Sequence, residues 1–482
     1  METVISINNL TKYYQKGKVT ALDNISLEIH EGEIFGLIGP DGSGKTTLFR
    51  LMTSLLVPDG GTLRVEGLDP VADYKQLRKR FGYMPGRFSL YPDLTVEENM
   101  RFFAAVFNTT IEENYHLVKD IYEQIERFKD RRAGKLSGGM KQKLALSCAL
   151  IHAPRVLFLD EPTTGVDPVS RRELWAMLRK LNKEYGITIV ASTPYRDEVF
   201  ECGRIALMEN GHVKAVGAPQ EVMPEETTIT STRGEWENAP FVIEAQGLTK
   251  QFGTFKAVDH ITLNVHKGEI FGFLGANGAG KTTAMRMFCG LSQPSDGKAI
   301  VAGYDSATQY EDIKRHIGYM SQRFSLYDDL TVEENMQLFG GIYGMTKEAI
   351  KKKTDEMIED LGLNDKRKKI VGSLPLGWKQ KLAFSISIFH SPGIVFLDEP
   401  TGGVDTETRK EFWQLIYKAA DRGTTIFVTT HYMDEAEYCD RVSIMVDGKI
   451  KAMDTPQQLK KTFNVDTMYD VFVTLARDAK RT

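Results

Sequence analysis

The sequence predicts an α/β protein built from two similar domains in tandem, and three observations support this. The stretch GEIFGLIGPDGSGKTT at residues 32–47 returns as GEIFGFLGANGAGKTT at residues 268–283. The run VLFLDEP ending at Pro162 returns as IVFLDEP ending at Pro400, and continuous apolar runs are typical of strands buried on both faces of a parallel sheet. A chain of 482 residues is long enough for two cores, and a period this long indicates a duplicated domain.

The domain boundaries follow from the two copies. We place the first domain at residues 1–222 and the second at residues 242–482. Residues 223–241 show no apolar periodicity, which predicts a linker.

Each domain opens with a short apolar strand that runs into the pattern G-x-x-x-x-G-K-T. Its glycines let the backbone wrap around a phosphate, its lysine adds a positive charge, and its threonine is a ligand for Mg²⁺. After the first loop, Leu48, Leu51 and Leu55 recur at helical spacing, which predicts the helix that such a loop requires. The predicted phosphate-binding residues are Gly39, Gly42, Gly44, Lys45, Thr46, Thr47, Gly275, Gly278, Gly280, Lys281, Thr282 and Thr283.

Paired acids end the second repeated strand of each domain. Ligand chemistry in parallel sheets occurs at the carboxyl ends of the strands, which is where these acids fall. We expect Asp160 and Asp398 to hold Mg²⁺ through water, together with Thr46 and Thr282. We expect Glu161 and Glu399 to polarise an attacking water molecule.

Composition excludes several other classes of protein. The net charge of −4 provides no basic field, so no nucleic-acid partner is expected. The four cysteines lack the spacing of a metal site, and we expect them to pack in the core of a reduced protein. No apolar run approaches the roughly 20 residues of a membrane span, and the first residues lack the pattern of a signal peptide.

Taken together and in order, these motifs resemble the ATP-binding domains of ABC transporters over nearly the whole chain. The resemblance implies two RecA-like P-loop domains, each with a helical signature subdomain and an antiparallel β subdomain. It implies ATP and Mg²⁺ as ligands, with Tyr14 and Phe252 stacking on adenine. It also implies a head-to-tail pair, in which each ATP lies between the phosphate loop of one half and the signature of the other.

The two halves differ at the residues that the family uses for hydrolysis. The second half has Gln322 as a Mg²⁺ ligand and His431 as the switch histidine, whereas the first has Gly86 and Pro194 at the matching positions. The signature, by contrast, is intact in the first half and altered in the second. The first half reads LSGGMKQK, with Ser137, Gly138 and Gly139 expected to contact ATP, and the second reads LPLGWKQK, with Pro375 and Leu376.

In a crossed arrangement, Gly86, Pro194, Pro375 and Leu376 all fall in one composite site, and the other site is complete. This segregation favours pairing of the two halves within one chain. The resulting hypothesis is that the second half's phosphate loop serves a hydrolysing site and the first half's loop holds ATP and turns it over slowly. Because Glu161 is retained, residual hydrolysis at the first site stays open.

The nearly identical strings RFSLYPDLTVEENM and RFSLYDDLTVEENM, at residues 87–100 and 323–336, suggest similar partners for both halves. In the family this region faces membrane domains, which implies two related permease subunits and a location at the cytoplasmic face of the inner membrane. The stretch IGYMSQRFSLYDDLTVEENM at residues 317–336 and the ending TMYDVFVTLARD are similar to the ATPases of bacterial type-two ABC exporters. The tandem layout with the second signature LPLGWKQ resembles a multidrug exporter ATPase. The transported substrate and the need for a periplasmic adaptor stay open.

A second class of function stays open as well. Tandem members of the family that do not serve transporters act on the ribosome as conformational switches. Those proteins join their halves by a long charged helical arm and usually keep both signatures, neither of which is found here. A DNA-repair protein of the family would need zinc cysteines or a coiled-coil insertion.

Overall fold

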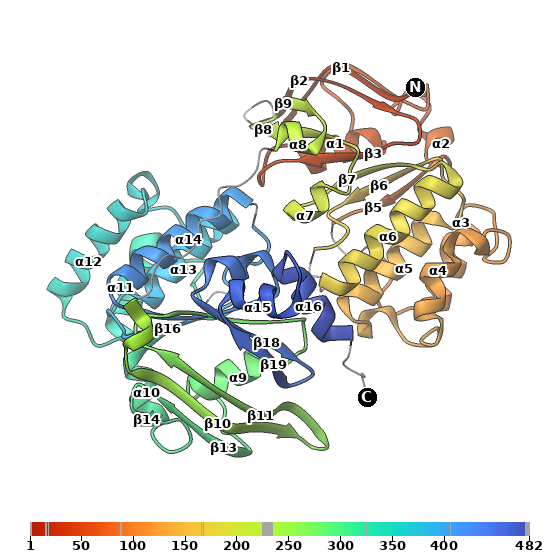
Figure 1. Cartoon of the computed structure of the whole chain (residues 1–482). Coiled ribbons are helices and arrows are strands. Elements are labelled where there is room, and N and C mark those ends of the chain that lie inside the picture. Colours follow the sequence, from red (N-terminus) through yellow and green to blue (C-terminus); the bar gives the residue numbers. More distant parts are fainter. Residues whose placement is uncertain are drawn as a thin grey trace. The chain divides into compact units, whose positions relative to one another are not determined.

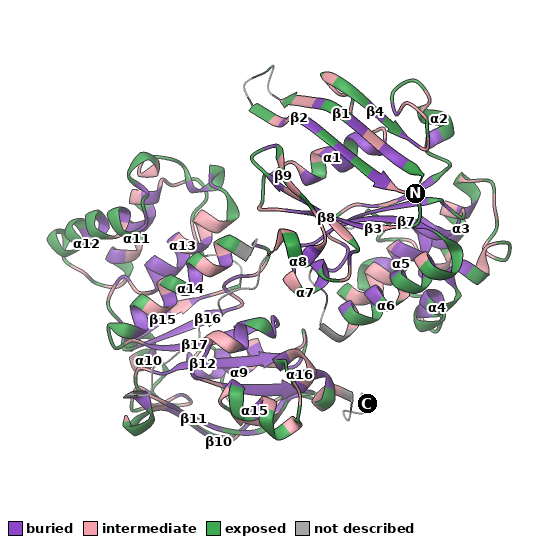
Figure 2. Cartoon of the chain, turned by 45° about the horizontal axis from the view of Figure 1, so that its top comes forward, coloured by how far each residue is buried: buried purple, intermediate pink, exposed green. Residues whose placement is uncertain are grey.

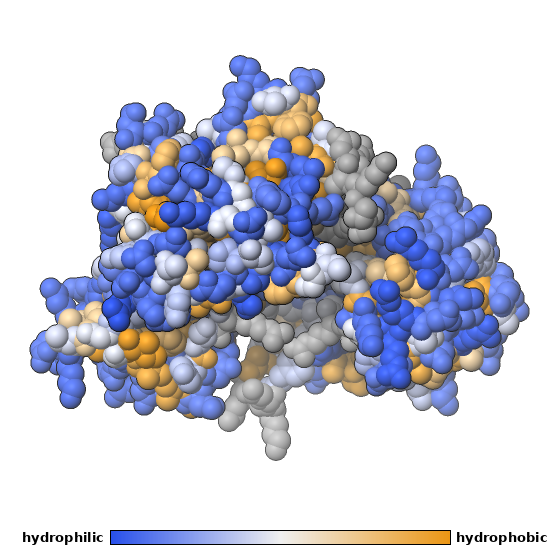
Figure 3. All heavy atoms as spheres, turned by 90° about the horizontal axis from the view of Figure 1, so that it is seen from below, coloured by the Kyte–Doolittle hydropathy of each residue, from blue (hydrophilic) through white to orange (hydrophobic). Residues whose placement is uncertain are grey.

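The computed structural model describes residues 2–14, 17, 19–86, 89–164, 166, 168–223, 235–322, 325–404 and 406–477. The chain divides into two compact units, residues 1–226 with 403–407 and residues 227–402 with 408–482 (Figure 1). No described helix is long and apolar enough to cross a membrane. Figure 3 shows one face of the chain, on which hydrophilic residues predominate and hydrophobic residues form separated groups.

A six-stranded sheet lies at the centre of each unit, and all of its strands but the last run parallel. In the first unit the order is β5 (Phe81–Met84), β6 (Val156–Asp160), β7 (Thr188–Ser192), β3 (Ile34–Ile38), β8 (Arg204–Glu209) and β9 (His212–Gly217). In the second unit the order is β15 (Ile317–Met320), β16 (Ile394–Asp398), β17 (Thr425–Thr430), β12 (Ile270–Gly275), β18 (Arg441–Val446) and β19 (Lys449–Asp454). This order places the carboxyl ends of β3, β6 and β7, and of their counterparts, along one edge.

A smaller antiparallel sheet accompanies each central sheet. In the first unit it contains β2 (Val19–His30), β1 (Thr3–Tyr14) and β4 (Gly60–Val65). In the second it contains β11 (Phe255–His266), β10 (Phe241–Phe252), β13 (Asp296–Val301) and β14 (Tyr304–Asp305).

Both units also contain helices. Helices α1 (Lys45–Met52) and α9 (Lys281–Phe288) follow the phosphate loops. The helical layer contains α3 (Val96–Val106), α4 (Tyr115–Glu126), α5 (Gly138–Leu150) and α6 (Pro168–Tyr185), and in the second unit α11 (Val332–Ile342), α12 (Lys347–Asp360), α13 (Leu376–Ser387) and α14 (Thr406–Asp421). The shorter helices are α2 (Tyr74–Leu77), α7 (Arg196–Val199), α8 (Pro219–Val222), α10 (Tyr310–His316), α15 (Pro456–Phe463) and α16 (Met468–Arg477).

The first unit has two cores, because side chains of the central strands point alternately to the two faces of the sheet. Phe35 and Leu37 of β3 pack with α1 and the antiparallel sheet. Ile34 and Ile38 of the same strand pack with the helical layer. Because successive side chains of a strand point to opposite faces, one strand serves both cores, and Figure 2 shows β3 as buried throughout. The predicted α/β fold with helical and antiparallel subdomains is confirmed.

The helix after the first phosphate loop is shorter than the leucine spacing predicted. It ends at Met52, and Leu55 lies outside it with 53% of its surface exposed. Ser54 takes a left-handed φ of 58°, and the Leu55 N–H bonds to the Arg50 carbonyl at 2.8 Å. This pattern is a Schellman turn, a backbone stop that apolar spacing does not reveal.

The predicted linker lies mostly outside the described residues, and its described end packs onto the second unit. Trp236 is buried, with its ring 5.6 Å from the ring of His266 and 5.7 Å from the guanidinium of Arg441. The boundary between the domains therefore stays a prediction over residues 224–234, which the structure does not describe. All four cysteines are buried with free thiols.

Candidate functional site

The two phosphate loops enter their helices with the same backbone conformation, which glycine makes possible. Gly44 and Gly280, the residues that precede α1 and α9, both take a left-handed φ of 104°. A side chain at Gly44 would meet the Ala21 carbonyl at 2.7 Å, and one at Gly280 would meet the Ala257 carbonyl at 2.2 Å. No other residue type fits these positions without moving backbone atoms.

The lysine of each loop folds back over the loop carbonyls. Lys45 Nζ donates to the carbonyls of Gly39 and Pro40 at 2.6 and 2.9 Å. Lys281 Nζ donates to the carbonyls of Gly275 and Ala276 at 2.8 and 3.1 Å. Both ammonium groups therefore lie inside the loop, where an anionic phosphate group would replace carbonyl partners.

The acid strands end beside these loops. In the second unit Asp398 Oδ1 accepts from the Thr282 hydroxyl at 3.1 Å and from the Thr429 hydroxyl at 2.7 Å. In the first unit Asp160 Oδ1 accepts from the Ser192 hydroxyl at 2.8 Å. The structure thus brings together Thr282 and Asp398, two residues that the sequence predicts as Mg²⁺ ligands.

The donor set fits Mg²⁺, which prefers hard oxygen ligands and usually keeps waters and phosphate oxygens in its shell. The Thr282 hydroxyl and the Asp398 carboxylate supply two such oxygens side by side. Among the described residues no group of three or more His, Cys, Asp or Glu side chains is placed to hold a metal ion. The arrangement matches an ion that phosphates share with one or two protein ligands.

Glu399 lies at the centre of a cluster in the second unit. Its carboxylate lies 3.5 Å from Lys281 Nζ and 3.1 Å from His431 Nδ1, and it accepts a hydrogen bond from Gln322 Nε2 at 2.9 Å. Burial alone would raise the pKa of Glu399, but His431 and Lys281 outweigh burial and lower the pKa to about 2. Glu399 is therefore held ionised by residues that the sequence predicts to act with it.

Glu161, the counterpart in the first unit, has different surroundings. Its carboxylate accepts from the Thr164 hydroxyl at 3.2 Å. Burial and the neighbouring Asp160 carboxylate raise the pKa of Glu161, and Lys45 offsets them only in part. A side chain at Gly86 would pass 3.8 Å from Glu161 Cβ, so the missing glutamine would lie beside this glutamate. Equivalent glutamates therefore have pKa values shifted in opposite directions.

Both glutamates sit in an unusual backbone conformation. The φ angles are 52° at Glu161 and 48° at Glu399, in the left-handed region that is uncommon for residues with a side chain. The Glu161 N–H donates to the Ser192 hydroxyl at 3.0 Å, and the Glu399 N–H donates to the Thr429 hydroxyl at the same distance. These bonds hold the glutamates at the strand ends.

The two hydroxyl residues were missed by the sequence analysis. Ser192 and Thr429 each bond both members of the adjacent acid pair. A signal was present, because each stands two residues before Pro194 or His431 in the repeated strand.

The two signatures begin equivalent helices with different caps. Ser137 precedes α5, and its hydroxyl accepts from the Met140 N–H at 3.4 Å. Pro375 precedes α13 without a side-chain cap, and Leu376 is 38% exposed. The predicted adenine-stacking residues also lie at the ends of equivalent strands. The Tyr14 hydroxyl is 3.5 Å from that of Thr47, and Phe252 is exposed.

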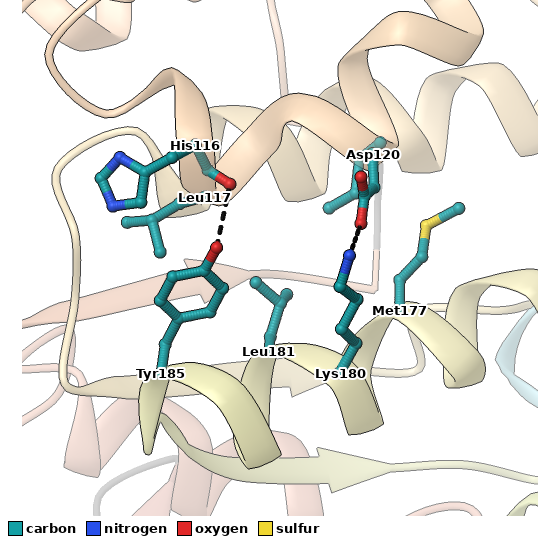
Figure 4. A pocket seen from close by; sticks show the side chains of 8 residues that line it. His116, Leu117, Asp120, Met177, Lys180, Leu181 and Tyr185 are labelled. Carbon is teal, nitrogen blue, oxygen red and sulfur yellow. Dashed lines mark hydrogen bonds and ion pairs between the residues drawn. The ribbon is translucent and has the colours of Figure 1, made fainter.

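A cavity of about 20 Å³ between α4 and α6 lies outside the predicted site (Figure 4). The Tyr185 hydroxyl donates to the His116 carbonyl at 3.2 Å, and Lys180 pairs with Asp120. None of the predicted nucleotide-binding residues lines it. Since it has room for little more than one water molecule, it is interhelical packing space.

Opposite shifts in pKa predict opposite effects of pH on stability in the nucleotide-free chain. Ionised Glu399 contributes stability that is present above its ordinary pKa of 4.5 and is lost as the pH falls toward about 2. By the usual free energy per pKa unit this amounts to at most about 3 kcal/mol. For Glu161, whose pKa is raised, stability is instead lost as the pH rises above its ordinary value of 4.5.

Near neutral pH we therefore expect Glu399→Gln to lower the free energy of unfolding and Glu161→Gln to raise it. Urea titrations of the two variants and the parent chain measure this difference. Shifts of the same sign for both variants would contradict it.

Comparison with known proteins gives matches along the whole chain. Residues 22–164 and 258–402 match the family model described as ABC transporter. The probable multidrug ABC transporter ATP-binding protein YbhF of Escherichia coli strain K12 is 39% identical over 99% of this chain and 98% of its own length. A putative ABC transporter ATP-binding protein of Methanosarcina acetivorans is 31% identical over 93% of this chain and 89% of its own.

Among solved structures, the archaeal ribosome recycling factor aABCE1, crystallised with the ribosomal stalk protein aP1, matches 95% of this chain and 92% of its own. The TM-score is 0.69 at 20% sequence identity, which is a likeness of fold alone.

Proposed function

Because this chain belongs to the ABC transporter family, whose ATP-binding domains are ATPases, we propose that it powers an exporter with separate permease subunits. The relative from Escherichia coli is named as a probable multidrug transporter protein and matches over nearly its full length, which supports drug or other xenobiotic efflux. The proposed location is the cytoplasmic face of the inner membrane, through contact with the permeases.

The observation that carries the proposal is the cluster around Glu399. Lys281, Gln322 and His431 all lie within 3.5 Å of its carboxylate. Such a carboxylate orients and polarises water for attack on a γ-phosphate, and phosphoryl transfer depends on this positioning and on charge stabilisation. Mg²⁺ bound by Thr282, Asp398 and Gln322 would neutralise phosphate charge.

We propose two composite ATP sites that differ in activity. In the hydrolysing site, the second half's phosphate loop works with the signature residues Ser137, Gly138 and Gly139. In the other site, the first half's phosphate loop works with Pro375 and Leu376. Hydrogen bonds to charged groups are worth about 1.5–3 kcal/mol, so losing two or three would slow hydrolysis by about two orders of magnitude or more. This site would bind ATP and hydrolyse it slowly.

Exposed apolar side chains at equivalent places in both units support the permease partners. In the second unit they are Tyr327, Leu338 and Ile342 on and before α11, with Tyr327 53% and Ile342 61% exposed. In the first unit they are Tyr91, Phe102 and Val106 on and before α3, and the ring centres of Tyr91 and Phe102 lie 4.8 Å apart. Arg87, Phe88, Arg323 and Phe324 of the repeated string lie outside the described residues. Apolar patches on otherwise polar surfaces are typical of protein contacts.

We expect Tyr327→Asp with Ile342→Asp to release the chain from membranes, because buried charge opposes docking. The measurement is the share of chain that sediments with the membrane fraction of cells that also produce the permeases. Leu55→Asp with Val57→Asp, at exposed apolar residues of the first unit, is the matched control. ATP turnover of the purified chain should stay within about twofold.

Sedimentation of the parent chain with ribosomes in place of membranes would instead favour the conformational switch on the ribosome. The fold likeness to a ribosome recycling factor does not favour this alternative, because its identity is only 20%.

A further inference from the structure

A buried carboxylate that the proposed mechanism does not use lies behind the cluster at Glu399. Glu435 is fully buried, in the short 3₁₀ helix Asp434–Tyr438 that follows His431. Its Oε1 accepts from the hydroxyl of Thr401, two residues beyond Glu399, at 2.5 Å. The Tyr432 N–H, next to His431, donates to the hydroxyl of Thr430 at 2.9 Å. Glu435 is thus bonded to the segment that follows Glu399.

An arginine completes this cluster. Arg409 of α14 lies 3.6 Å from Glu435 Oε1 through Nε and 3.1 Å from Asp434 Oδ2 through Nη1. Its guanidinium also lies 4.1 Å from the centre of the Tyr432 ring. That ring is 4.3 Å from the ring of His431. The residue after His431 is therefore packed on the arginine that pairs with Glu435.

The first unit contains a similar network without the histidine. Glu198 accepts from the hydroxyls of Thr163 and Thr193 at 2.7 and 2.5 Å. Arg171 lies 3.9 Å from Glu198 Oε1 and 3.9 Å from the centre of the Tyr195 ring. The position between Thr193 and Tyr195 is Pro194. The chain therefore carries an internal control, a matched cluster that has no imidazole to position.

Burying a carboxylate is costly unless partners compensate for the lost water. Thr401 and Arg409 are such partners for Glu435 Oε1, whereas Oε2 has no hydrogen-bond partner among the described residues. His431 must keep its Nδ1 about 3.1 Å from Glu399 Oε2 for the pair to act together. Catalytic groups need support that holds them to within roughly 0.5 Å. The bond from Thr401 ties Glu435 to the segment after Glu399, and the ion pair with Arg409 ties it to the Tyr432 ring beside His431.

We propose that Glu435 is a positioning residue that holds His431 against Glu399 by tying Thr401 to Arg409, which packs on the Tyr432 ring beside His431. This role concerns the second unit alone, and it rests on the proposed hydrolysis at Glu399 only for its effect on turnover. Glu435 touches neither ATP nor water in this role; it acts through Thr401 and Arg409.

The first test observes the histidine itself. The full chain is labelled with ¹³C at histidine, and the His431 ring signal is identified from its loss in His431→Ala. Glu435→Gln is expected to shift or broaden this signal, and Glu198→Gln is expected to leave it unchanged. Thr401→Val, which removes one bond without changing charge, should act like Glu435→Gln if that variant folds poorly. A His431 signal unchanged in folded Glu435→Gln or Thr401→Val overturns the proposal.

The second test is a double-mutant cycle on ATP turnover. Glu435→Gln is expected to lower kcat about tenfold with KM within twofold, and Glu198→Gln to leave both within twofold. In the His431→Ala chain, adding Glu435→Gln should lower kcat by less than twofold. If Glu435→Gln lowers kcat as much in the His431→Ala chain as in the parent chain, its role is generally structural and the proposal is overturned. If the ring signal moves as expected but His431→Ala keeps the parent kcat, the positioning stands and the catalytic role of His431 fails.

Discussion

Replacing Glu399 by Gln is expected to lower ATP turnover of the intact chain by at least about 100-fold, the usual scale for loss of a catalytic base. Glu161→Gln should lower it by less than about threefold. The reason is the difference in surroundings. Glu399 is kept ionised beside Lys281 and His431, whereas burial raises the pKa of Glu161 and Gly86 stands in place of glutamine. Single-turnover hydrolysis with membrane partners present is the measurement.

The two variants control for each other, because they make the same change at equivalent strand ends. ATP binding by each should stay near that of the parent chain, since both phosphate loops are intact. Equal losses of turnover would mean that the differences at Gly86, Pro194 and the signatures have no consequence.

Restoring the four differing groups should give activity to the first site. In the Glu399→Gln chain, adding Gly86→Gln, Pro194→His, Pro375→Ser and Leu376→Gly is expected to raise turnover by about 100-fold. The estimate follows from two or three regained hydrogen bonds to charged groups, at about 1.5–3 kcal/mol each. Steady-state phosphate release by the purified chain measures it.

The structure permits this repair with one adjustment. A Cβ at residue 86 would lie 3.1 Å from the Asp160 carbonyl, so the neighbouring backbone must yield by a few tenths of an ångström. As a control, adding Glu161→Gln to the repaired chain should abolish the gain. Turnover that stays at the level of Glu399→Gln alone would contradict the crossed arrangement of loops and signatures.

Much of the fold and of the site was predictable because it depends on local patterns. The phosphate loops need glycine at Gly44 and Gly280 for a left-handed backbone, and no other residue type serves as well. The acid pairs follow strands that are apolar throughout, so burial on both faces could be read directly from the sequence. Because the domain is duplicated, each of these patterns occurs twice in the sequence, and the second copy supports the interpretation of the first.

The rest depends on contacts between distant segments, which periodicity does not encode. Leu55 has helical spacing, yet a backbone turn at Ser54 ends the helix before it. Trp236 stands in a stretch without pattern, yet it packs on His266 and Arg441. Glu435 looks like an ordinary acid of a polar helix, and only the fold shows that Thr401 reaches it.

The left-handed backbone at Glu161 and Glu399 limits which residues can replace them without a cost to folding. Glutamate already bears about 1–2 kcal/mol of strain in that conformation, so exchange for another unbranched residue leaves the cost unchanged, and exchange for glycine relieves it. A β-branched residue would add to the strain. Residues 86 and 194 have no left-handed φ. A β-branched substitution is therefore costlier to folding at the two glutamates than at these two positions.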